Sequence, residues 1–195
     1  RPEADYIANS ERLFRRAIAR LIYPEARQLI EAHRAKGHSI AIVSSATPYQ
    51  VRPAAKDLGI DDVYASDLEV IDGQFTGRVV QPTCFGEGKV LAAETFTEAK
   101  KSTLNDCFFY SDSTDDIELL EAVGYPVVLN GSRQLRVIAR ERGWAAAHFT
   151  SRGNASGSQI FRSLAATGSL VGSFLLGLPL YALSGSRRDS INFSI

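Results

Sequence analysis

Short apolar runs alternate with segments of helical periodicity along most of this 195-residue sequence. The apolar runs have the composition of buried strands. They lie at 39–44, 62–66, 107–111, 126–129 and 145–149. Helical patterns occupy 4–21, 25–36, 48–58, 86–99, 115–123 and 132–142. Alternation of this kind predicts an α/β domain in which helices cover both faces of a parallel sheet.

Two further runs, 68–71 and 74–79, flank the dipeptide Asp72-Gly73. Because Asp-Gly is typical of a two-residue turn between antiparallel strands, these runs predict a β-hairpin. Cys84 and Cys107 are expected to be small apolar residues in a reducing compartment. His33 is expected on the surface of its helix.

Composition excludes several classes of protein. Hydrophobic residues make up 45% of the chain and charged residues 23%, which excludes a disordered tail, a collagen-like fibre and a coiled-coil rod. The 22 basic and 22 acidic residues give zero net charge, which argues against a general nucleic-acid binder.

The C-terminal part has a different composition. Residues 151–161 are rich in Gly, Ser and Asn, as expected of a linker. Arg162 and Arg187 then enclose 24 uncharged residues, enough for a helix to cross a bilayer core of about 30 Å. We expect 162–195 to be a hydrophobic helical segment that associates with a membrane, with lipid contact through 164–183. A buried helical hairpin of a soluble domain is the alternative.

Polar side chains stand where two of the predicted strands end. Ser44 and Ser45 follow the first strand, and Asp112 and Asp116 follow the strand at 107–111. In open α/β sheets, ligand sites lie outside the carboxyl ends of the strands. These residues are therefore expected to converge on one crevice.

The chemistry of this set suits a phosphate and a cation. The Ser44 hydroxyl and the neighbouring amides can bind phosphate oxygens, and Lys89, at a helix start, can neutralise the phosphate. Asp112 and Asp116 offer the oxygen ligands that Mg²⁺ prefers. Each residue also has a structural alternative: a turn-forming serine, a solvated lysine, or acids that cap a helix.

Three segments in this order resemble motifs II, III and IV of haloacid-dehalogenase-superfamily phosphatases, in particular the phosphoserine-phosphatase-like subfamily IB. They are 40–45, 82–89 and 110–116. The resemblance extends over about 11–149. It implies a Rossmann-like three-layer core with a parallel sheet and a partial helical cap at the N-terminus. It also implies Mg²⁺-dependent hydrolysis of small phosphomonoesters through an aspartyl-phosphate.

The resemblance also implies roles for single residues. Ser44 and Lys89 would be catalytic, and Ser44, Ser45 and Lys89 would bind the phosphoryl group. Asp112 would ligate Mg²⁺ directly, and Asp116 would support the metal.

One motif of that family, Asp-x-Asp-x-Thr, is absent from residues 1–195. Its first Asp is the nucleophile and its second the general acid/base. We expect it upstream, as the lack of any Met also indicates, and we expect this chain alone to be inactive. Its strand would lie between those of Ser44 and Asp112, so that position would be open unless another segment covers it.

The expected organisation has four parts. Residues 1–22 would be the remnant of a helical cap, 23–150 the phosphatase core without its motif I strand, 151–161 a linker, and 162–195 the hydrophobic segment.

The stretches 149–153 and 186–193 resemble the junction in actinobacterial proteins that join such a phosphatase to a 1-acylglycerol-3-phosphate acyltransferase. This resemblance implies an acyltransferase domain beyond Ile195, a role in phospholipid synthesis, and a place on the cytoplasmic side of the membrane. The alternative is a catalytically degenerate phosphate-binding or scaffold module that anchors and regulates the acyltransferase.

Overall fold

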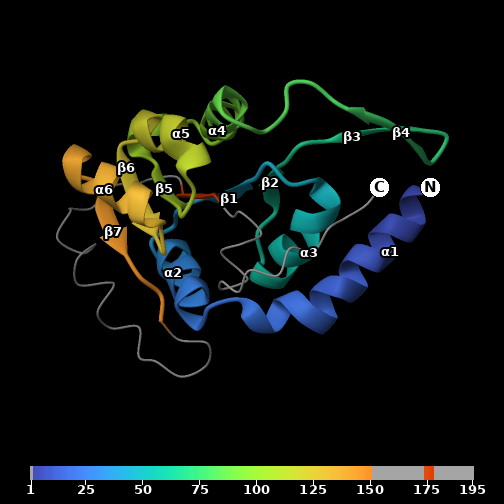
Figure 1. The fold of residues 1–195 in the computed structure, drawn as a ribbon, viewed down its shortest axis with the longest axis horizontal. Helices are drawn as coiled ribbons and strands as arrows, with labels where there is room; N and C mark the ends of the chain where they lie inside the picture. The colour runs from blue at the N-terminus through green and yellow to red at the C-terminus, as the bar shows by residue number, and fades with distance from the viewer. Residues whose placement is uncertain (1, 151–173, 178–195) are drawn as a thin grey trace.

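The computed structural model describes residues 2–150 and 174–177 (Figure 1). The helices are α1 Glu3–Leu13, α2 Pro24–Ala35, α3 Pro48–Leu58, α4 Glu87–Ala99, α5 Ile117–Ala122 and α6 Arg133–Arg142. The strands are β1 Ile40–Val43, β2 Asp62–Tyr64, β3 Leu68–Ile71, β4 Gln74–Val79, β5 Phe108–Ser111, β6 Tyr125–Leu129, β7 Ala145–Ala147 and β8 Phe174–Gly177.

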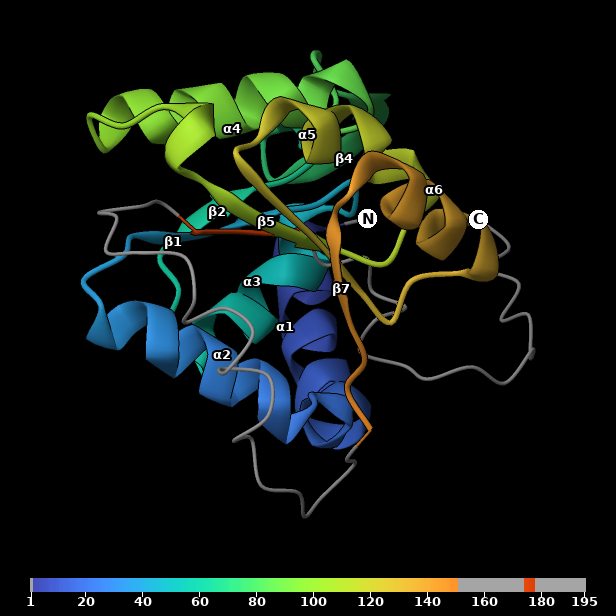
Figure 2. The ribbon, with the colours of Figure 1, turned by 90° about the vertical axis from the view of Figure 1, so that its left-hand side faces the viewer.

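Six of these strands form one sheet in the order β2-β1-β8-β5-β6-β7, and every neighbouring pair is parallel. Helices α2 and α3 lie on one side of the sheet, and α4, α5 and α6 on the other (Figure 2). The expected α/β fold, with a parallel sheet between two helical layers, is therefore confirmed.

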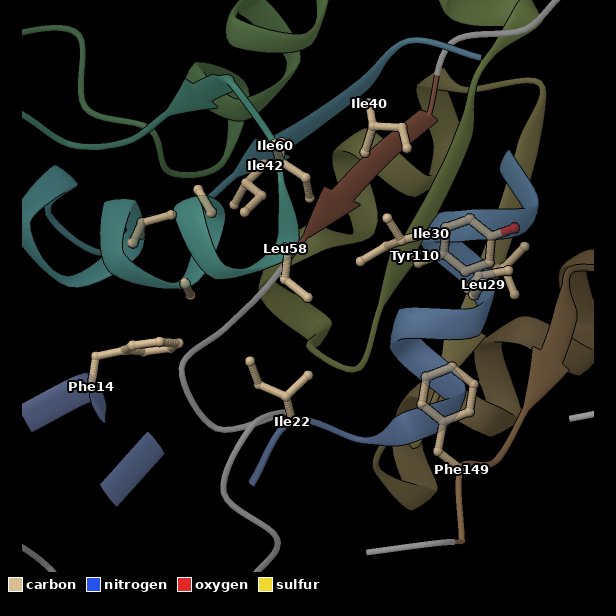
Figure 3. Packing of buried hydrophobic residues seen from close by; sticks show 14 residues of the cluster. Phe14, Ile22, Leu29, Ile30, Ile40, Ile42, Leu58, Ile60, Tyr110 and Phe149 are labelled. Carbon is tan, nitrogen blue, oxygen red and sulfur yellow. The ribbon is translucent and has the colours of Figure 1, made fainter. Parts of the chain in front are cut away.

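The alternation of side chains along the strands divides the core in two. Ile40 and Ile42 of β1 pack with α2 and α3 in one cluster of buried residues (Figure 3). Ala41 and Val43 face the opposite side and pack with α4, α5 and α6. Because all four side chains are buried, β1 is covered on both faces, as a parallel strand must be.

The N-terminal segment differs from the single helix expected over 4–21. Helix α1 ends at Leu13, and the chain continues as a π-helical turn, Phe14–Ile18, and a 3-10 turn, Ala19–Leu21. Leu13 is exposed, whereas Phe14 is buried in the same cluster as β1. The change of helix type thus accompanies the burial of Phe14, a tertiary contact that helical periodicity does not encode.

The predicted hairpin is present as β3 and β4. Asp72 and Gly73 both have positive φ, 50° and 71°, as a tight primed turn requires. The hairpin tip contacts the start of α1, since the amide of Glu3 donates to the carbonyl of Gly73 over 2.9 Å.

The expected C-terminal helix does not extend through Phe174–Gly177. These four residues form β8, which pairs in parallel with β1 on one side and β5 on the other. A short apolar run does not reveal from its pattern whether it becomes helix or strand. The buried edges of β1 and β5 decide the outcome, because their amides and carbonyls need partners. β8 thus covers the position that the lack of motif I was expected to leave open.

The remaining residues of 162–195, and the linker expected at 151–161, lie outside the described residues. Within the part of the chain that is described, no helix is both long and apolar enough to cross a membrane.

Candidate active site

Ser44 follows directly after β1, at the carboxyl end of the sheet. Its amide donates to the carbonyl of Tyr64 over 2.9 Å, and its hydroxyl oxygen accepts from the amide of Ala46 over 3.2 Å. These bonds hold the turn after β1, and the Ser44 side chain is buried. The next residue, Ser45, is exposed.

Lys89 lies in the first turn of α4 and is only 3% exposed. Two glycines shape this helix start. Gly86 takes a positive φ of 54° at the N-cap. At Gly88 an added Cβ would lie 1.8 Å from the carbonyl oxygen of Thr83, so only glycine fits without a backbone shift. The sequence Gly-Glu-Gly-Lys therefore packs the helix start closely and directs Lys89 inward.

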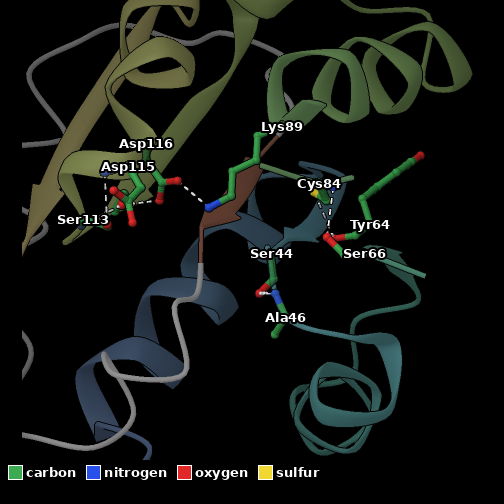
Figure 4. Close-up of polar contacts among 10 residues, drawn as sticks. Ser44, Ala46, Tyr64, Ser66, Cys84, Lys89, Ser113, Asp115 and Asp116 are labelled. Atoms are coloured by element: carbon green, nitrogen blue, oxygen red, sulfur yellow. Dashed lines mark hydrogen bonds and ion pairs between the residues drawn. The ribbon is translucent and has the colours of Figure 1, made fainter. Parts of the chain in front are cut away.

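Lys89 forms a buried ion pair with Asp116 (Figure 4). The Lys89 ammonium contacts Oδ1 of Asp116, and the Ser111 hydroxyl donates to Oδ2 over 2.6 Å. Ser111 Oγ in turn accepts from the amide of Ser113 over 3.0 Å. Both oxygens of Asp116 are therefore engaged, and this carboxylate acts as the partner that holds Lys89.

Asp112 follows β5 and has a different environment. Its Oδ1 is buried and has no hydrogen-bond partner. The pKa of Asp112 is raised to about 6, mainly by burial and also by the charge of Asp116, while a hydrogen bond from its own backbone amide and the charge of Lys89 act in the opposite direction. Burying a carboxylate oxygen without a hydrogen-bond donor costs free energy unless a ligand or a cation binds to it.

The sheet topology sets the spacing of these groups. β1 and β5 are separated by one strand, β8, so their carboxyl ends lie about 10 Å apart. Cys84 connects the two halves of the site. Burial raises the pKa of its thiol, whereas a backbone hydrogen bond from Ser44 and the charge of Lys89 lower it. The Cys84 thiol donates to the carbonyl of Tyr64 over 3.6 Å, the same carbonyl that accepts from the Ser44 amide.

The structure therefore joins Lys89 and Asp116 directly and places Asp112 beside them. Ser44 lies at the end of β1, which β8 separates from β5. Two polar contributors were not among the residues selected from the sequence. Ser111, the last residue of β5, supports Asp116, and its place at a strand end is a signal that could have been used. The second is Ser66, whose hydroxyl accepts from the amide of Cys84 over 3.0 Å. Its sequence position did not indicate this contact, because Ser66 follows an edge strand.

The next question is whether the side chains at this site can bind the Mg²⁺ that the resemblance implies. No group of three or more His, Cys, Asp or Glu side chains gathers as a metal centre in the described ranges. Mg²⁺ nevertheless often takes only one or two carboxylates, with water and phosphate completing its shell. The unpartnered oxygen of Asp112 matches that requirement, so the residues present fit this cation.

Comparison with known proteins gives consistent results. The family profile described as haloacid dehalogenase-like hydrolase matches residues 2–121. The chain is 34% identical over 145 residues to phosphoserine phosphatase SerB1 of Mycobacterium tuberculosis, covering 74% of this chain and 47% of that protein. It is 30% identical over 132 residues to a histidinol-phosphatase of Neisseria meningitidis, covering 66% and 60%.

A solved structure also matches. A protein of unknown function from Bordetella pertussis superimposes with a TM-score of 0.72 at 32% identity, covering 77% of this chain and 69% of that one. The chain spans about half the length of the mycobacterial relatives that it matches. The family profile covers more than half of the sequence, and its range includes the segments 40–45, 82–89 and 110–116. The chain belongs to the haloacid dehalogenase-like hydrolases.

Proposed function

We propose that this chain is the phosphate-handling core of a Mg²⁺-dependent phosphomonoester hydrolase that acts through an aspartyl-phosphate. The observation that carries the proposal is the buried ion pair of Lys89 and Asp116 beside the unpartnered oxygen of Asp112. A buried cation and an unsatisfied carboxylate at the carboxyl edge of a parallel sheet form a suitable receptor for a phosphate with its metal.

Each residue of the site has a separate role in this proposal. Ser44 and Ser45 bind phosphoryl oxygens, and Lys89 stabilises the negative charge on them, since an ammonium has three donors and one contacts Asp116. Asp116 positions Lys89, and Asp112 holds the metal. Bound Mg²⁺ would neutralise charge on the transferring phosphoryl group.

The nucleophile is part of the same proposal. Residues 1–195 contain no Asp-x-Asp-x-Thr. We propose that a segment upstream of residue 1 supplies this aspartate, and that residues 1–195 alone do not turn over substrate.

The substrate class follows from the relatives. One is named a phosphoserine phosphatase and another a histidinol-phosphatase. The substrate in each of the two names is a phosphate ester of a small alcohol that carries an amino group. We propose a small phosphomonoester of this kind as the substrate.

The test is hydrolysis of p-nitrophenyl phosphate by the full-length protein with and without Mg²⁺. We expect Asp112→Asn and Lys89→Met each to lower the rate at least about 100-fold, as loss of a group that stabilises transition-state charge does. Asp115→Asn is the matched control, because Asp115 is exposed in the same turn. Full activity of Asp112→Asn, or equal activity without Mg²⁺, would contradict the proposal.

A non-catalytic phosphate-binding or scaffold module is the second candidate. The observation that favours it is β8, which fills the central strand position. The residue that follows β8 in the sequence is Leu178 and not the aspartate that a nucleophile would require. Calorimetry with inorganic phosphate and Mg²⁺ separates the two functions. A scaffold module binds phosphate without any turnover in the full-length protein.

We further propose that the protein continues beyond Ile195 into a glycerolipid acyltransferase, acts in phospholipid synthesis and lies on the cytoplasmic face of a membrane. Lipid contact through 164–183 would require Phe174–Gly177 to leave the sheet, since they pair with β1 and β5. Flotation with anionic lipid vesicles tests this: protein that stays with the soluble fraction contradicts membrane contact.

A further inference from the structure

Ser111, the last residue of β5, makes two hydrogen bonds through one buried hydroxyl. Its Oγ accepts from the amide of Ser113 over 3.0 Å and donates to Oδ2 of Asp116 over 2.6 Å. The residue is 2% exposed. We infer, on the basis of the proposed function, that Ser111 is a positioning residue: it orients the carboxylate of Asp116 and thereby the ammonium of Lys89 for contact with phosphate.

The strand brings Ser111 to the layer from which Lys89 comes. Side chains alternate along β5, and Phe109 packs in the cluster that α4, α5 and α6 cover. Ser111 stands two residues further and therefore faces the same side. Lys89 reaches this side from the first turn of α4 and points to Asp116 (Figure 4). A residue on a strand is a more rigid support for a functional group than a residue on a loop.

The two bonds of Ser111 fix the direction of its hydroxyl hydrogen. A serine hydroxyl has one hydrogen to donate and two lone pairs. The amide of Ser113 occupies a lone pair, and the single hydrogen goes to Asp116. Asp116 is only 1% exposed, so bulk water does not solvate this carboxylate. Removing the Ser111 hydroxyl would therefore leave Oδ2 of Asp116 buried without this donor, which is unfavourable.

Asp116 has another set of donors close by. It occupies the N-cap of α5, where an aspartate usually accepts from amides of the first helical turn. Within the part of the chain that the structure describes, its side chain makes no such cap bond. The carboxylate is instead turned to Ser111 and Lys89. Without the Ser111 hydroxyl, the α5 amides would compete for this carboxylate, and Lys89 would lose its fixed partner.

The orientation of Lys89 determines what it offers to phosphate. Its ammonium has three N–H donors, and the contact with Asp116 leaves two of them for phosphoryl oxygens. The direction of these two follows from the position of the Asp116 carboxylate. A displaced ammonium would stabilise the phosphate charge less well, although it would still be present. The effect of losing Ser111 should therefore be smaller than the effect of losing Lys89.

The experiment uses the full-length protein, p-nitrophenyl phosphate with Mg²⁺ for the rate, and calorimetry with inorganic phosphate for binding. We expect Ser111→Ala to lower kcat/KM and phosphate affinity about tenfold each, as loss of a group that orients a ligand does. Ser111→Thr keeps the hydroxyl and should stay within about threefold of wild type. Ser102→Ala is the matched control, because the Ser102 hydroxyl donates to Asp106 over 3.4 Å before β5 begins. It should change neither quantity.

A second measurement separates positioning from a general structural role. In the Lys89→Met background, Ser111→Ala should change the rate less than about twofold, because residues that act through one group are not additive. A general distortion of the site would lower the rate by the same factor in both backgrounds.

That equal factor would overturn the inference, as would wild-type activity in Ser111→Ala or a folded Ser111→Thr variant as slow as Ser111→Ala. All three results leave the proposed function intact. A wild-type protein that neither hydrolyses the ester nor binds phosphate would instead refute the proposed function, and the role of Ser111 with it.

Discussion

The Lys89–Asp116 pair is the residue-scale feature on which both the site and local stability depend. The side chains are 4% and 0% exposed, so solvent screens neither charge. Removing one partner of such a pair leaves the other buried without compensation, which costs more than the pair contributes. A substitution at either position is therefore less costly when the other residue is replaced as well.

We predict that Lys89→Met lowers the free energy of unfolding by about 3–5 kcal/mol, because Asp116 is left as a buried charge. The double variant Lys89→Met/Asp116→Asn should lose less than this single variant. Arg15→Ala, which breaks a largely exposed pair with Glu11, should change stability by about 0–1 kcal/mol. Urea unfolding measures all three, and a double variant less stable than Lys89→Met would contradict the argument.

A second buried polar group lies on the opposite side of the sheet. His33 of α2 contacts His38 through their Nδ1 atoms at 2.8 Å and the Tyr110 hydroxyl through Nε2 at 2.9 Å. Burial, together with the charges of His38 and Lys36, lowers the pKa of His33 to about 3. His33 was expected on a helix surface, and only the packing of α2 against β5 shows that it is buried.

This pKa predicts an acid-sensitive stability. Above pH 6.5 His33 is neutral in both states, so it adds no pH dependence. Below pH 6.5 the unfolded chain binds a proton that the native state excludes down to about pH 3. Stability therefore falls with decreasing pH, by up to about 1.4 kcal/mol per pH unit.

Urea midpoints between pH 7.5 and 5 test this expectation. His33→Gln should flatten the profile, because glutamine does not titrate. His148→Gln, at an exposed histidine, should leave it unchanged. An equal slope in wild type and His33→Gln would show that other groups cause the pH dependence.

Among the elements, α1 is attached mainly through aromatic contacts, since none of its own residues is buried. The rings of Tyr6, Tyr49 and Phe75 form a trio with centroid separations of 5.3–5.5 Å, joining α1, α3 and β4. Tyr49 also donates to the Glu3 carboxylate over 2.7 Å. The hairpin thus holds the first helix against the core.

Phe75→Ala should loosen this attachment without unfolding the domain. Each aromatic pair is worth about 0.5–1.5 kcal/mol, so amides of α1 should exchange about tenfold faster while those of α6 are unaffected. Hydrogen exchange measures the difference. Val79→Ala, at an exposed position of the same strand, is the control. Unchanged exchange in α1 would show that the trio does not hold the helix.

Elements with strong local signals were predictable from the sequence. The hairpin followed from Asp72-Gly73, and the β1 strand from its apolar run. The change of helix type at Phe14 and the strand at Phe174–Gly177 were not predictable, because both depend on contacts with distant segments. For the candidate site, strand ends indicated Ser44 and Asp112, whereas the engagement of both Asp116 oxygens required the folded geometry.

In the whole molecule, the two buried clusters share the central strands. Ile42 belongs to the cluster under α2 and α3, while Trp144, the single tryptophan of the chain, packs against the other cluster. Because β1 contributes to both faces, the domain should unfold as one cooperative unit.

Ile42→Ala should therefore lower stability by about 2–5 kcal/mol and shift the Trp144 fluorescence transition together with the far-ultraviolet signal. Val137→Ala, at an exposed residue of α6, should move neither by more than about 0.5 kcal/mol. A Trp144 transition that stays in place while the other moves would indicate two independent units.

The position of β8 also bears on synthesis by the ribosome. The codons of β1 and β5 are translated well before those of Phe174–Gly177. At about 5–20 residues per second, roughly 3–13 s pass between the end of β5 and the end of β8. During this interval β1 and β5 lack the strand that pairs with both of them in this structure, and apolar strand edges that await a partner favour contact with chaperones.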